Sequence, residues 1–356
     1  MSSRIWVMIM TIVISLITMS CQKDDGFNEE EITDTLSVYV YRAGVEMHQD
    51  RYSALYMKNR QKVVLPSVTG GSTIARDIKV SGDDVYVVGE ELNEEQESVK
   101  ALLWVNGQAQ ELNAPNSKSV TAKAVFVKDN DVYVIGSYLP QAENATYRAI
   151  VWKNGEFTHI GSNDVSTRLE DIFVLNNEVH VVGYENHQGG IISKYWKNGI
   201  ESVLSHIDTT TYAKSIYVDQ DNVYIVGYTD AIGERSFKLW KNGVPTKLIS
   251  GERINRGLDL TVENENVYAA GYEQVGNKYV PRVFKNNELL PIQHTASGHT
   301  YAFAVQVVDE KVYVLGSEYR NGKQANIIWE NGKEIDFLSV ESGYSEFQSM
   351  IVVPKE

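Results

Sequence analysis

Short β-rich segments recur along the chain at a nearly fixed interval. In residues 85–89, VYVVG, apolar residues and a tyrosine precede a glycine, and the same pattern returns five more times, once with His180 in place of the tyrosine. The glycines are spaced 47, 47, 44, 44 and 45 residues apart, and they are Gly89, Gly136, Gly183, Gly227, Gly271 and Gly316. A period in the forties that is filled with short β segments is typical of propeller blades rather than of helical solenoids.

Each repeat divides into four predicted strands, a to d, as in residues 213–248. Strand a is residues 213–218 (AKSIYV), and strand b is residues 223–228 (VYIVGY), where the glycine ends the apolar run. Strand c is residues 237–240 (FKLW), and an Asn-Gly pair leads into a short strand d. Asn-Gly favours a two-residue hairpin turn because both of its residues tolerate positive φ.

Strand a appears seven times, but its last copy, residues 347–352, has no strands b to d after it. The beginning of the chain supplies them as residues 38–42, 54–59 and 63–65, with Arg42 aligned to Gly89 at a spacing of 47. We therefore predict an all-β fold, a seven-bladed β-propeller over residues 36–356 with four antiparallel strands per blade. A composite blade, the C-terminal innermost strand beside three N-terminal strands, would close the ring and remove exposed sheet edges.

One tryptophan per repeat stands at the end of strand c. The set is Trp104, Trp152, Trp196, Trp240 and Trp329. Large aromatic side chains at such a position can pack between blades or form platforms for sugars. Phe284 and Met57 take the same slot, and a sugar platform tolerates methionine poorly, so packing is the favoured interpretation. The tyrosines of strand b, including Tyr39, are interpreted in the same way.

The chain begins with an apolar run typical of a secretory signal. Arg4 precedes the uncharged residues 5–20, which form too short a run for a comfortable membrane span, and Cys21 follows. Cys21 is the only cysteine, so it cannot form an intramolecular disulfide. The segment resembles bacterial lipoprotein signals, which implies a signal peptide at 1–20 and lipidation of Cys21. An ordinary signal peptide with an incidental cysteine is the alternative.

The residues after the cysteine resemble the acidic export signal of Bacteroidota surface lipoproteins, and they are Gln22, Lys23, Asp24 and Asp25. Together with Cys21 they belong to residues 21–35, a polar, acidic segment that we predict to be a flexible tether. The resemblance implies a lipid-anchored protein of the outer membrane that faces the cell exterior. The lipid anchor would be its only contact with the membrane.

Charge and motif content exclude several classes of function. The net charge of −14 argues against nucleic-acid binding, which needs a basic stripe. The chain has no H-E-x-x-H or G-x-S-x-G motif, and its seven histidines lack ligand spacing, so we predict no catalytic residues, metal or cofactor. Paired carboxylates of a glycoside hydrolase have a spacing that exists only in three dimensions, which leaves a polysaccharide-degrading enzyme open.

Differences between the repeats point to a candidate site. The second and third positions of strand a carry charged residues in several blades, and they are Arg76, Asp77, Lys123, Glu170, Asp171, Lys214 and Asp259. If the third position faces the central channel, three carboxylates ring its mouth beside several cations. That set would bind an anionic sugar or a cation. Alternatively, these groups cap loops or pair with one another across blades.

The repeated pattern VYVvGy…WKNG resembles uncharacterised propeller lipoproteins of Bacteroidota over essentially the whole chain after the signal. The resemblance implies a fold and a location but no activity, because a fold alone does not confer function. The sequence therefore predicts a monomeric, non-enzymatic binding module. Its variable loops on one propeller face would contact a glycan, a protein partner or an envelope complex.

Overall fold

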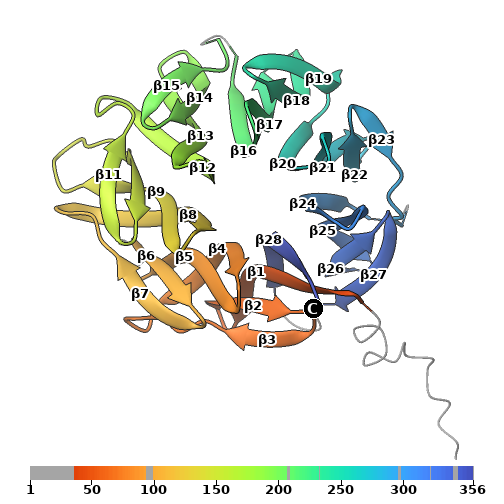
Figure 1. Cartoon of the computed structure of the whole chain (residues 1–356), viewed down its shortest axis with the longest axis horizontal. Coiled ribbons are helices and arrows are strands. Elements are labelled where there is room, and N and C mark those ends of the chain that lie inside the picture. The colour runs from red at the N-terminus through yellow and green to blue at the C-terminus, as the bar shows by residue number, and fades with distance from the viewer. Residues whose placement is uncertain are drawn as a thin grey trace, which may run out of the picture. The chain divides into compact units, whose positions relative to one another are not determined.

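The computed structural model describes residues 36–93, 99–206, 209–231, 233–295, 298–320, 322–339 and 344–355. The described strands form seven antiparallel four-stranded sheets, arranged as blades around a central channel (Figure 1). We number the blades 1 to 7 by their order along the chain, with blade 1 containing β1. The predicted seven-bladed propeller is confirmed. The predicted signal peptide, lipidation site and export signal lie outside the described residues.

Every blade has the strand order a-b-c-d from the channel outward. The innermost strands a are β28 (Tyr344–Pro354), β4 (Ser72–Ser81), β8 (Ser117–Lys128), β12 (Ser166–Leu175), β16 (Thr211–Asp219), β20 (Asn255–Glu263) and β24 (Thr300–Val308). Strands b are β1 (Val38–His48), β5 (Asp84–Leu92), β9 (Asp131–Pro140), β13 (Glu178–His187), β17 (Asn222–Ala231), β21 (Asn266–Val275) and β25 (Lys311–Arg320). Strands c are β2 (Arg51–Lys58), β6 (Val99–Val105), β10 (Arg148–Lys153), β14 (Gly190–Lys197), β18 (Glu234–Lys241), β22 (Lys278–Lys285) and β26 (Lys323–Glu330). Strands d are β3 (Gln61–Val64), β7 (Gln108–Leu112), β11 (Glu156–Ile160), β15 (Ile200–Val203), β19 (Val244–Gly251), β23 (Glu288–Leu290) and β27 (Lys333–Ser339).

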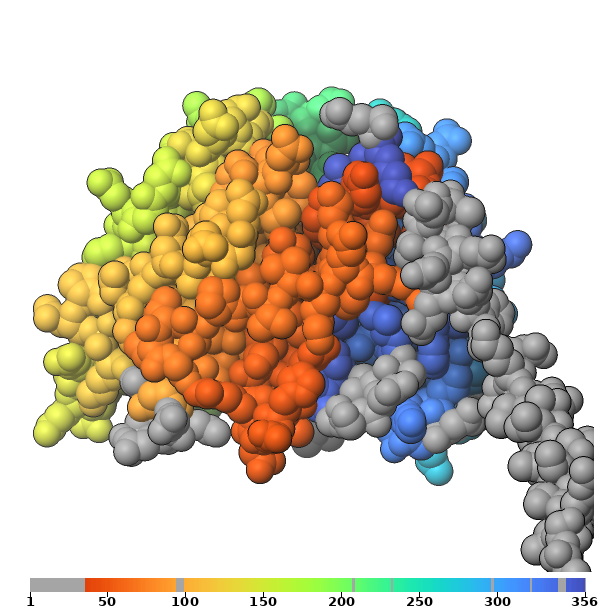
Figure 2. Space-filling view, turned by 90° about the horizontal axis from the view of Figure 1, so that it is seen from below, coloured from red at the N-terminus to blue at the C-terminus, as the bar shows by residue number. Residues whose placement is uncertain are grey.

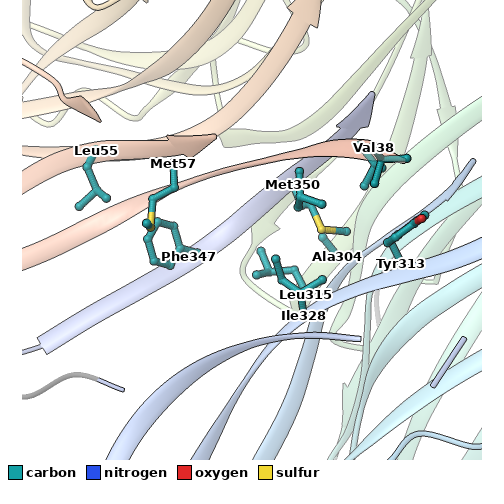
Figure 3. Packing of buried hydrophobic residues seen from close by; sticks show 11 residues of the cluster. Val38, Leu55, Met57, Ala304, Tyr313, Leu315, Ile328, Phe347 and Met350 are labelled. Atoms are coloured by element: carbon teal, nitrogen blue, oxygen red, sulfur yellow. The ribbon is translucent and has the colours of Figure 1, made fainter. Parts of the chain in front are cut away.

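Blade 1 is the composite blade that the sequence predicts. Its strand order is β28-β1-β2-β3, and β28 pairs with β1 from Val38↔Pro354 to Met47↔Tyr344. Phe347 and Met350 of β28 are buried in a core that blades 1 and 7 share (Figure 3). Seen from the side, the red N-terminal strand and the blue C-terminal strand lie against each other (Figure 2). The two ends of the described chain therefore close the ring.

The alignment of blade 1 differs from the prediction by two residues. Gly44, rather than Arg42, pairs with the first position of strand a, as Gly89 does in blade 2. Arg42 instead pairs with Met57. These two residues thus have the positions that Val87 and Trp104 have in blade 2. Tyr41 thus replaces Tyr39 as the repeat tyrosine. The prediction failed here because the first blade lacks both the tryptophan and the apolar residue that mark the slot elsewhere.

The repeated asparagine after strand c has a second function besides its turn. Asn242 and Gly243 have φ of 51° and 79°, which confirms the predicted hairpin geometry. The Asn242 Oδ1 also accepts a hydrogen bond of 2.8 Å from the N–H of Val223, the second residue of β17. All seven blades repeat this bond, with donors Val40, Val85, Val132, Val179, Val223, Val267 and Val312. An asparagine therefore connects strands b and c in each blade.

The repeated glycine does not end strand b, as the sequence suggested, but lies within it. β17 continues beyond Gly227 to Ala231. A Cβ on Gly227 would lie 1.9 Å from the carbonyl oxygen of Tyr212 in β16, because β16 carries a β-bulge beside it. Every blade has a register shift at this point of strand a. The glycine therefore recurs because it makes room for the bulge.

We expect Gly227→Ala to destabilise the protein by at least about 1–3 kcal/mol, since the new methyl group overlaps backbone that cannot rotate away. Gly251 provides a matched control, because a Cβ there meets no atom within 4 Å. Thermal denaturation of the two variants measures the difference. Equal melting temperatures for Gly227→Ala and Gly251→Ala would contradict the packing role of the repeat glycine.

The tryptophans pack between blades, as predicted. Trp152 of blade 3 is fully buried against Val88 and Leu103 of blade 2. Its Nε1–H donates a hydrogen bond of 3.0 Å to the carbonyl oxygen of Asn113, in the connection between blades 2 and 3. Trp104 and Trp329 make the same kind of bond.

No helix long and apolar enough to cross a membrane occurs among the described residues.

Candidate functional site

All seven candidate residues predicted from the sequence line one cavity of about 330 Å³ in the central channel. They come from the innermost strands of five consecutive blades, β4, β8, β12, β16 and β20. The second and third positions of strand a from the remaining two blades complete the wall, with Phe303, Ala304, Gln348 and Ser349. Strand a begins at the end of the propeller where the b–c and d–a connections lie. We call this end of the cavity the channel mouth.

The β-bulge explains why two consecutive residues of each strand line the channel. In a regular strand the second and third positions would point to opposite faces of the sheet. The register shift between Leu169 and Asp171 leaves Glu170 unpaired, so both Glu170 and Asp171 reach the cavity. The site therefore has an outer layer, from the second positions, and an inner layer, from the third positions.

The three inner aspartates connect neighbouring blades. Asp77, Asp171 and Asp259 each accept a hydrogen bond of 2.8 to 2.9 Å from a backbone N–H of the next blade. The donors are Val125, Ile216 and Val305, the residue after the third position in each case. The carboxylates thus face the channel, as one interpretation of the sequence required, and also connect neighbouring blades through backbone N–H groups, which neither interpretation included.

Ser215 bridges two of these carboxylates. Its Oγ lies 2.8 Å from Asp171 Oδ2 and 3.0 Å from Asp259 Oδ1. A serine hydroxyl has one proton to donate, so both contacts are hydrogen bonds only when one of the aspartates is protonated. Burial raises the pKa of Asp171 from 3.8 to about 7, with Asp77 and Asp259 adding to the rise and Lys79 opposing it. Burial likewise raises the pKa of Asp259 to about 6.

Lys79, which the sequence analysis did not select, lies among the three aspartates. Its Nζ is 3.8 Å from Asp77 Oδ1. Burial alone would lower the pKa of Lys79, but the charges of Asp77, Asp171 and Asp259 outweigh it and raise the pKa. The side chain alternation of a strand could have identified Lys79, because the fifth position lies on the same face as the third.

We expect Asp171→Asn to flatten the pH dependence of thermal stability. The folded pKa of Asp171 is raised from 3.8 to about 7, so the folded state retains a proton that the unfolded state releases. This contribution to stability is fully present below about pH 4 and is lost as the pH rises through 7. Asparagine cannot ionise, although its amide oxygen still accepts the N–H of Ile216. Melting curves from pH 4 to pH 8 test this, and equal slopes for wild type and variant would contradict it.

The outer layer is cationic on one side of the mouth. Glu170 accepts contacts from Lys123 at 3.2 Å and from Lys214 at 2.6 Å. Burial would raise the pKa of Glu170, but the two ammonium groups outweigh it and lower the pKa to about 2. Burial lowers the pKa of Lys214, with Glu170 opposing the change. Arg76 pairs with Glu90 through its Nε at 2.7 Å.

A second cavity of about 350 Å³ adjoins the first and shares Arg76, Lys123 and Glu170 with it. Arg168, which the sequence analysis also missed, lines this cavity. Its guanidinium lies 3.6 Å from the centre of the Tyr147 ring and donates one hydrogen bond of 3.2 Å to Ser137 Oγ. Among the described residues, no carboxylate forms an ion pair with Arg168. By contrast, Arg76, Lys123 and Lys214 each pair with a glutamate.

Aromatic side chains form an arc over blades 4 to 7, from Tyr184 in the second cavity to Phe303 in the first. Neighbouring ring centroids are 4.9 to 5.9 Å apart, in the pairs Tyr184–Tyr212, Tyr212–Tyr228, Tyr272–Tyr301 and Tyr301–Phe303. Arg256 lies between the two halves, over the Tyr228 ring at 4.6 Å, and its Nη2 is 2.9 Å from Asp230. Burial raises the pKa of Tyr184 and Tyr301 to about 12, so these phenols stay neutral.

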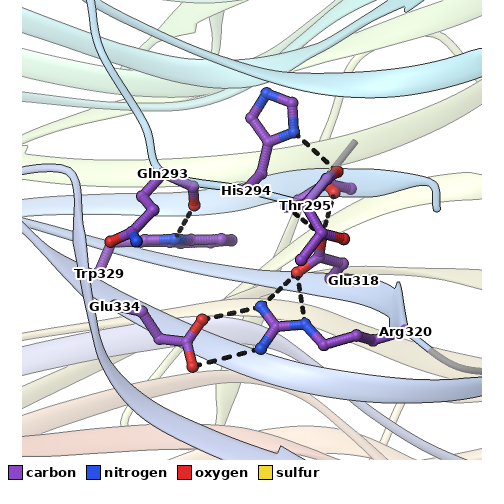
Figure 4. A network of polar contacts seen from close by, with 8 residues as sticks. Gln293, His294, Thr295, Glu318, Arg320, Trp329 and Glu334 are labelled. Atoms are coloured by element: carbon purple, nitrogen blue, oxygen red, sulfur yellow. Dashed lines mark hydrogen bonds and ion pairs between the residues drawn. The ribbon is translucent and has the colours of Figure 1, made fainter. Parts of the chain in front are cut away.

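Buried glutamates hold the connections around the mouth in place. Glu318 of β25 accepts hydrogen bonds from the backbone N–H and the hydroxyl of Thr295 and pairs with Arg320, which in turn contacts Glu334 (Figure 4). Glu91 has the same position in blade 2 and accepts the N–H groups of Val68 and Gly71. Two of the connections between strands d and a are thus held by a carboxylate two residues after the repeat glycine.

The described residues contain no group of three or more His, Cys, Asp or Glu side chains that could hold a metal ion. Within the inner layer, Lys79 supplies the positive charge that a bound cation would supply. The aspartates already accept backbone N–H groups. The inner layer therefore has a cation of its own, Lys79, beside its three carboxylates.

Comparisons with known proteins assign neither a family nor a function to this chain. No protein-family model and no curated protein sequence matches the chain. An acylaminoacyl peptidase of Pyrococcus horikoshii is similar in structure, with a TM-score of 0.49 and 12% identity over 86% of this chain and 53% of the peptidase. The computationally designed Ika8 protein has a TM-score of 0.38 and 14% identity over 83% of this chain and 82% of its own. The chain spans about half the length of the peptidase, and likenesses this distant carry no argument about activity.

Proposed function

We propose that this protein is a binding module whose ligand enters the channel mouth. The observation that carries the proposal is that the charged residues that vary between repeats line one cavity, at the end of the propeller where the variable b–c loops lie. Ligand sites are concave, with apolar and aromatic walls and a few convergent polar groups. The channel mouth has this composition. Blade packing does not require a charged residue at the bulge position. Leu258 and Phe303 occupy it in two blades, where two other blades have Arg76 and Lys123.

The proposed setting is the cell surface. The resemblance of residues 1–25 to lipoprotein signals supports a lipid anchor at Cys21 and an outer-membrane location facing the exterior. Tethered by residues 22–35, the propeller would present its mouth to glycans, protein partners or envelope complexes. Labelling with radioactive palmitate, compared between wild type and Cys21→Ala, tests the anchor, and equal incorporation would contradict it.

A polysaccharide-degrading enzyme is the alternative, with Asp171 and Asp259 as its acids. Their raised pKa values and the shared contact with Ser215 favour it. Against it, both carboxylates accept backbone N–H groups that hold the blades together. Acids that serve as structural ties are poorly placed to change partners during a reaction.

A glycan array followed by product analysis separates the two functions. We expect the protein to bind one class of glycan, to release no shorter products from it, and to lose binding in Gln348→Trp. Gln348 is exposed and lines the cavity, so a tryptophan there would obstruct the mouth without disturbing the core. Product formation that Asp171→Asn or Asp259→Asn abolishes would contradict the binding function. Undiminished binding by Gln348→Trp would contradict the channel mouth as the site.

A further inference from the structure

We propose that the ligand of the channel mouth is an acidic glycan, with its carboxylate or sulfate groups on the Arg168 side and its sugar rings on the tyrosine arc. This inference rests on the proposed function and specifies the class of ligand. It is drawn from the charge, the aromatic content and the size of the two adjoining cavities.

The outer layer of the mouth has the opposite charge to the protein as a whole. The net charge of the chain is −14. Among the described residues of the outer layer and the adjoining cavity, however, four cations meet two carboxylates, Glu90 and Glu170, while the aspartates of the inner layer lie deeper around Lys79. The cations are Arg76, Lys123, Arg168 and Lys214. A local excess of two positive charges on an acidic protein attracts an anion to this place in particular.

Arg168 is the cation best placed to bind that anion. It donates one hydrogen bond to Ser137, forms no ion pair among the described residues, and lies against the Tyr147 ring, which restricts the motion of its guanidinium. Its remaining N–H donors form a planar fork that matches a carboxylate or a sulfate. Lys123 lines the same cavity and has a side chain that is 38% exposed, so it can contribute a second contact.

The aromatic residues fit a sugar ring. Tyr272 and Phe303 line the first cavity, and Tyr184 lines the second. The C–H faces of a pyranose pack on such rings, while neutral tyrosine hydroxyls and the amides of Gln306 and Gln348 can bond to its hydroxyls. A cavity of about 330 Å³ is at the small end of the range for ligand sites, about 300–1,000 Å³. It takes a short segment of a glycan rather than a folded protein.

The inner layer is not expected to bind the acidic groups of the ligand. Its three aspartates surround Lys79, so an anion is repelled from the depth of the channel and held near the outer layer. The two layers thus give the ligand one orientation, with acid groups at the rim.

Two matched pairs of probes test the inference by titration calorimetry: oligogalacturonate against its methyl ester, and dextran sulfate against dextran. We expect at least one acidic member to bind at least about tenfold more tightly than its neutral partner, the value of one charged hydrogen bond. Arg168→Gln should weaken that binding about tenfold. Arg168→Lys, which keeps the charge but not the fork, should weaken it less. Lys197→Gln, at the opposite end of the blades and paired with Glu178, is the control and should change nothing.

The possible outcomes separate this inference from the proposed function. Equal affinity for acidic and neutral members, no binding of either acidic probe, or full affinity in Arg168→Gln would overturn the acidic class. In those cases a neutral glycan whose binding is lost in Gln348→Trp would still support the channel mouth as a site. Acidic binding that Gln348→Trp leaves unchanged would overturn both.

Discussion

A chain that lacks residues 347–356 should no longer unfold cooperatively near the melting temperature of the intact protein. The deletion removes most of β28, the innermost strand of blade 1, and leaves an unpaired edge on β1. It also removes Phe347, Met350 and Val352 from the core between blades 1 and 7. At about 1.5–3 kcal/mol for each buried side chain, the loss is about 5–9 kcal/mol, comparable to the entire stability of many domains.

The matched control is a chain that ends at Pro354. It loses the hydrogen bond from Lys355 N–H to the Ser37 carbonyl oxygen, but it keeps all pairs between β28 and β1. We expect it to melt within a few degrees of the intact protein. If calorimetry gives the longer deletion the same melting temperature as this control, the composite closure does not stabilise the ring.

Asp336→Asn should destabilise the protein by about 3–5 kcal/mol, the usual cost of leaving a buried charge without its partner. Arg42 of blade 1 is fully buried, and its Nη1 lies 2.8 Å from Asp336 Oδ2 in β27 of blade 7. Asp336 also pairs with Arg60 at 2.9 Å. The ion pairs therefore join the first and last blades at the point where the ring closes. Chemical denaturation measures the loss.

Arg42→Val combined with Asp336→Asn should recover most of that stability. The six other blades place apolar residues in this slot, namely Val87, Val134, Val181, Ile225, Ala269 and Val314. Valine there removes the buried charge and restores the packing of a regular blade. If the double variant is as unstable as Asp336→Asn alone, the cost comes from Arg60 or from the local packing of β27 and not from the uncompensated Arg42.

The ring could be predicted from the sequence because certain residues recur in the blades, and each of them has the same structural role in every blade where it occurs. The glycine makes room for the bulge, the asparagine caps strand b, and the tryptophan fills the space between blades, so each leaves a periodic signal. Strand b of blade 1 was misaligned by two residues because Arg42 and Met57 replace that signal, and Arg42 instead pairs with Asp336 across the closure. A contact that occurs in one blade leaves no periodic signal in the sequence.

The candidate site was predicted in part for the same reason. Comparing repeats identified the second and third positions of strand a, and all seven of those residues line one cavity. It missed Lys79 and Arg168 because it covered the second and third positions alone, whereas Lys79 has the fifth position and Arg168 precedes the first. It also missed the aromatic arc, whose members come from five different strands. The hydrogen bonds of Asp77, Asp171 and Asp259 to the next blade depend on the spacing between blades, which no single repeat contains.

A crystal structure of the protein soaked with the glycan that it binds most tightly is the decisive test of the channel mouth as an acidic-glycan site. We expect electron density in the channel mouth, with acidic groups within hydrogen-bond distance of Arg168 and a sugar ring against Tyr272. Density only at the opposite end of the channel, or on the outer strands d, would contradict it.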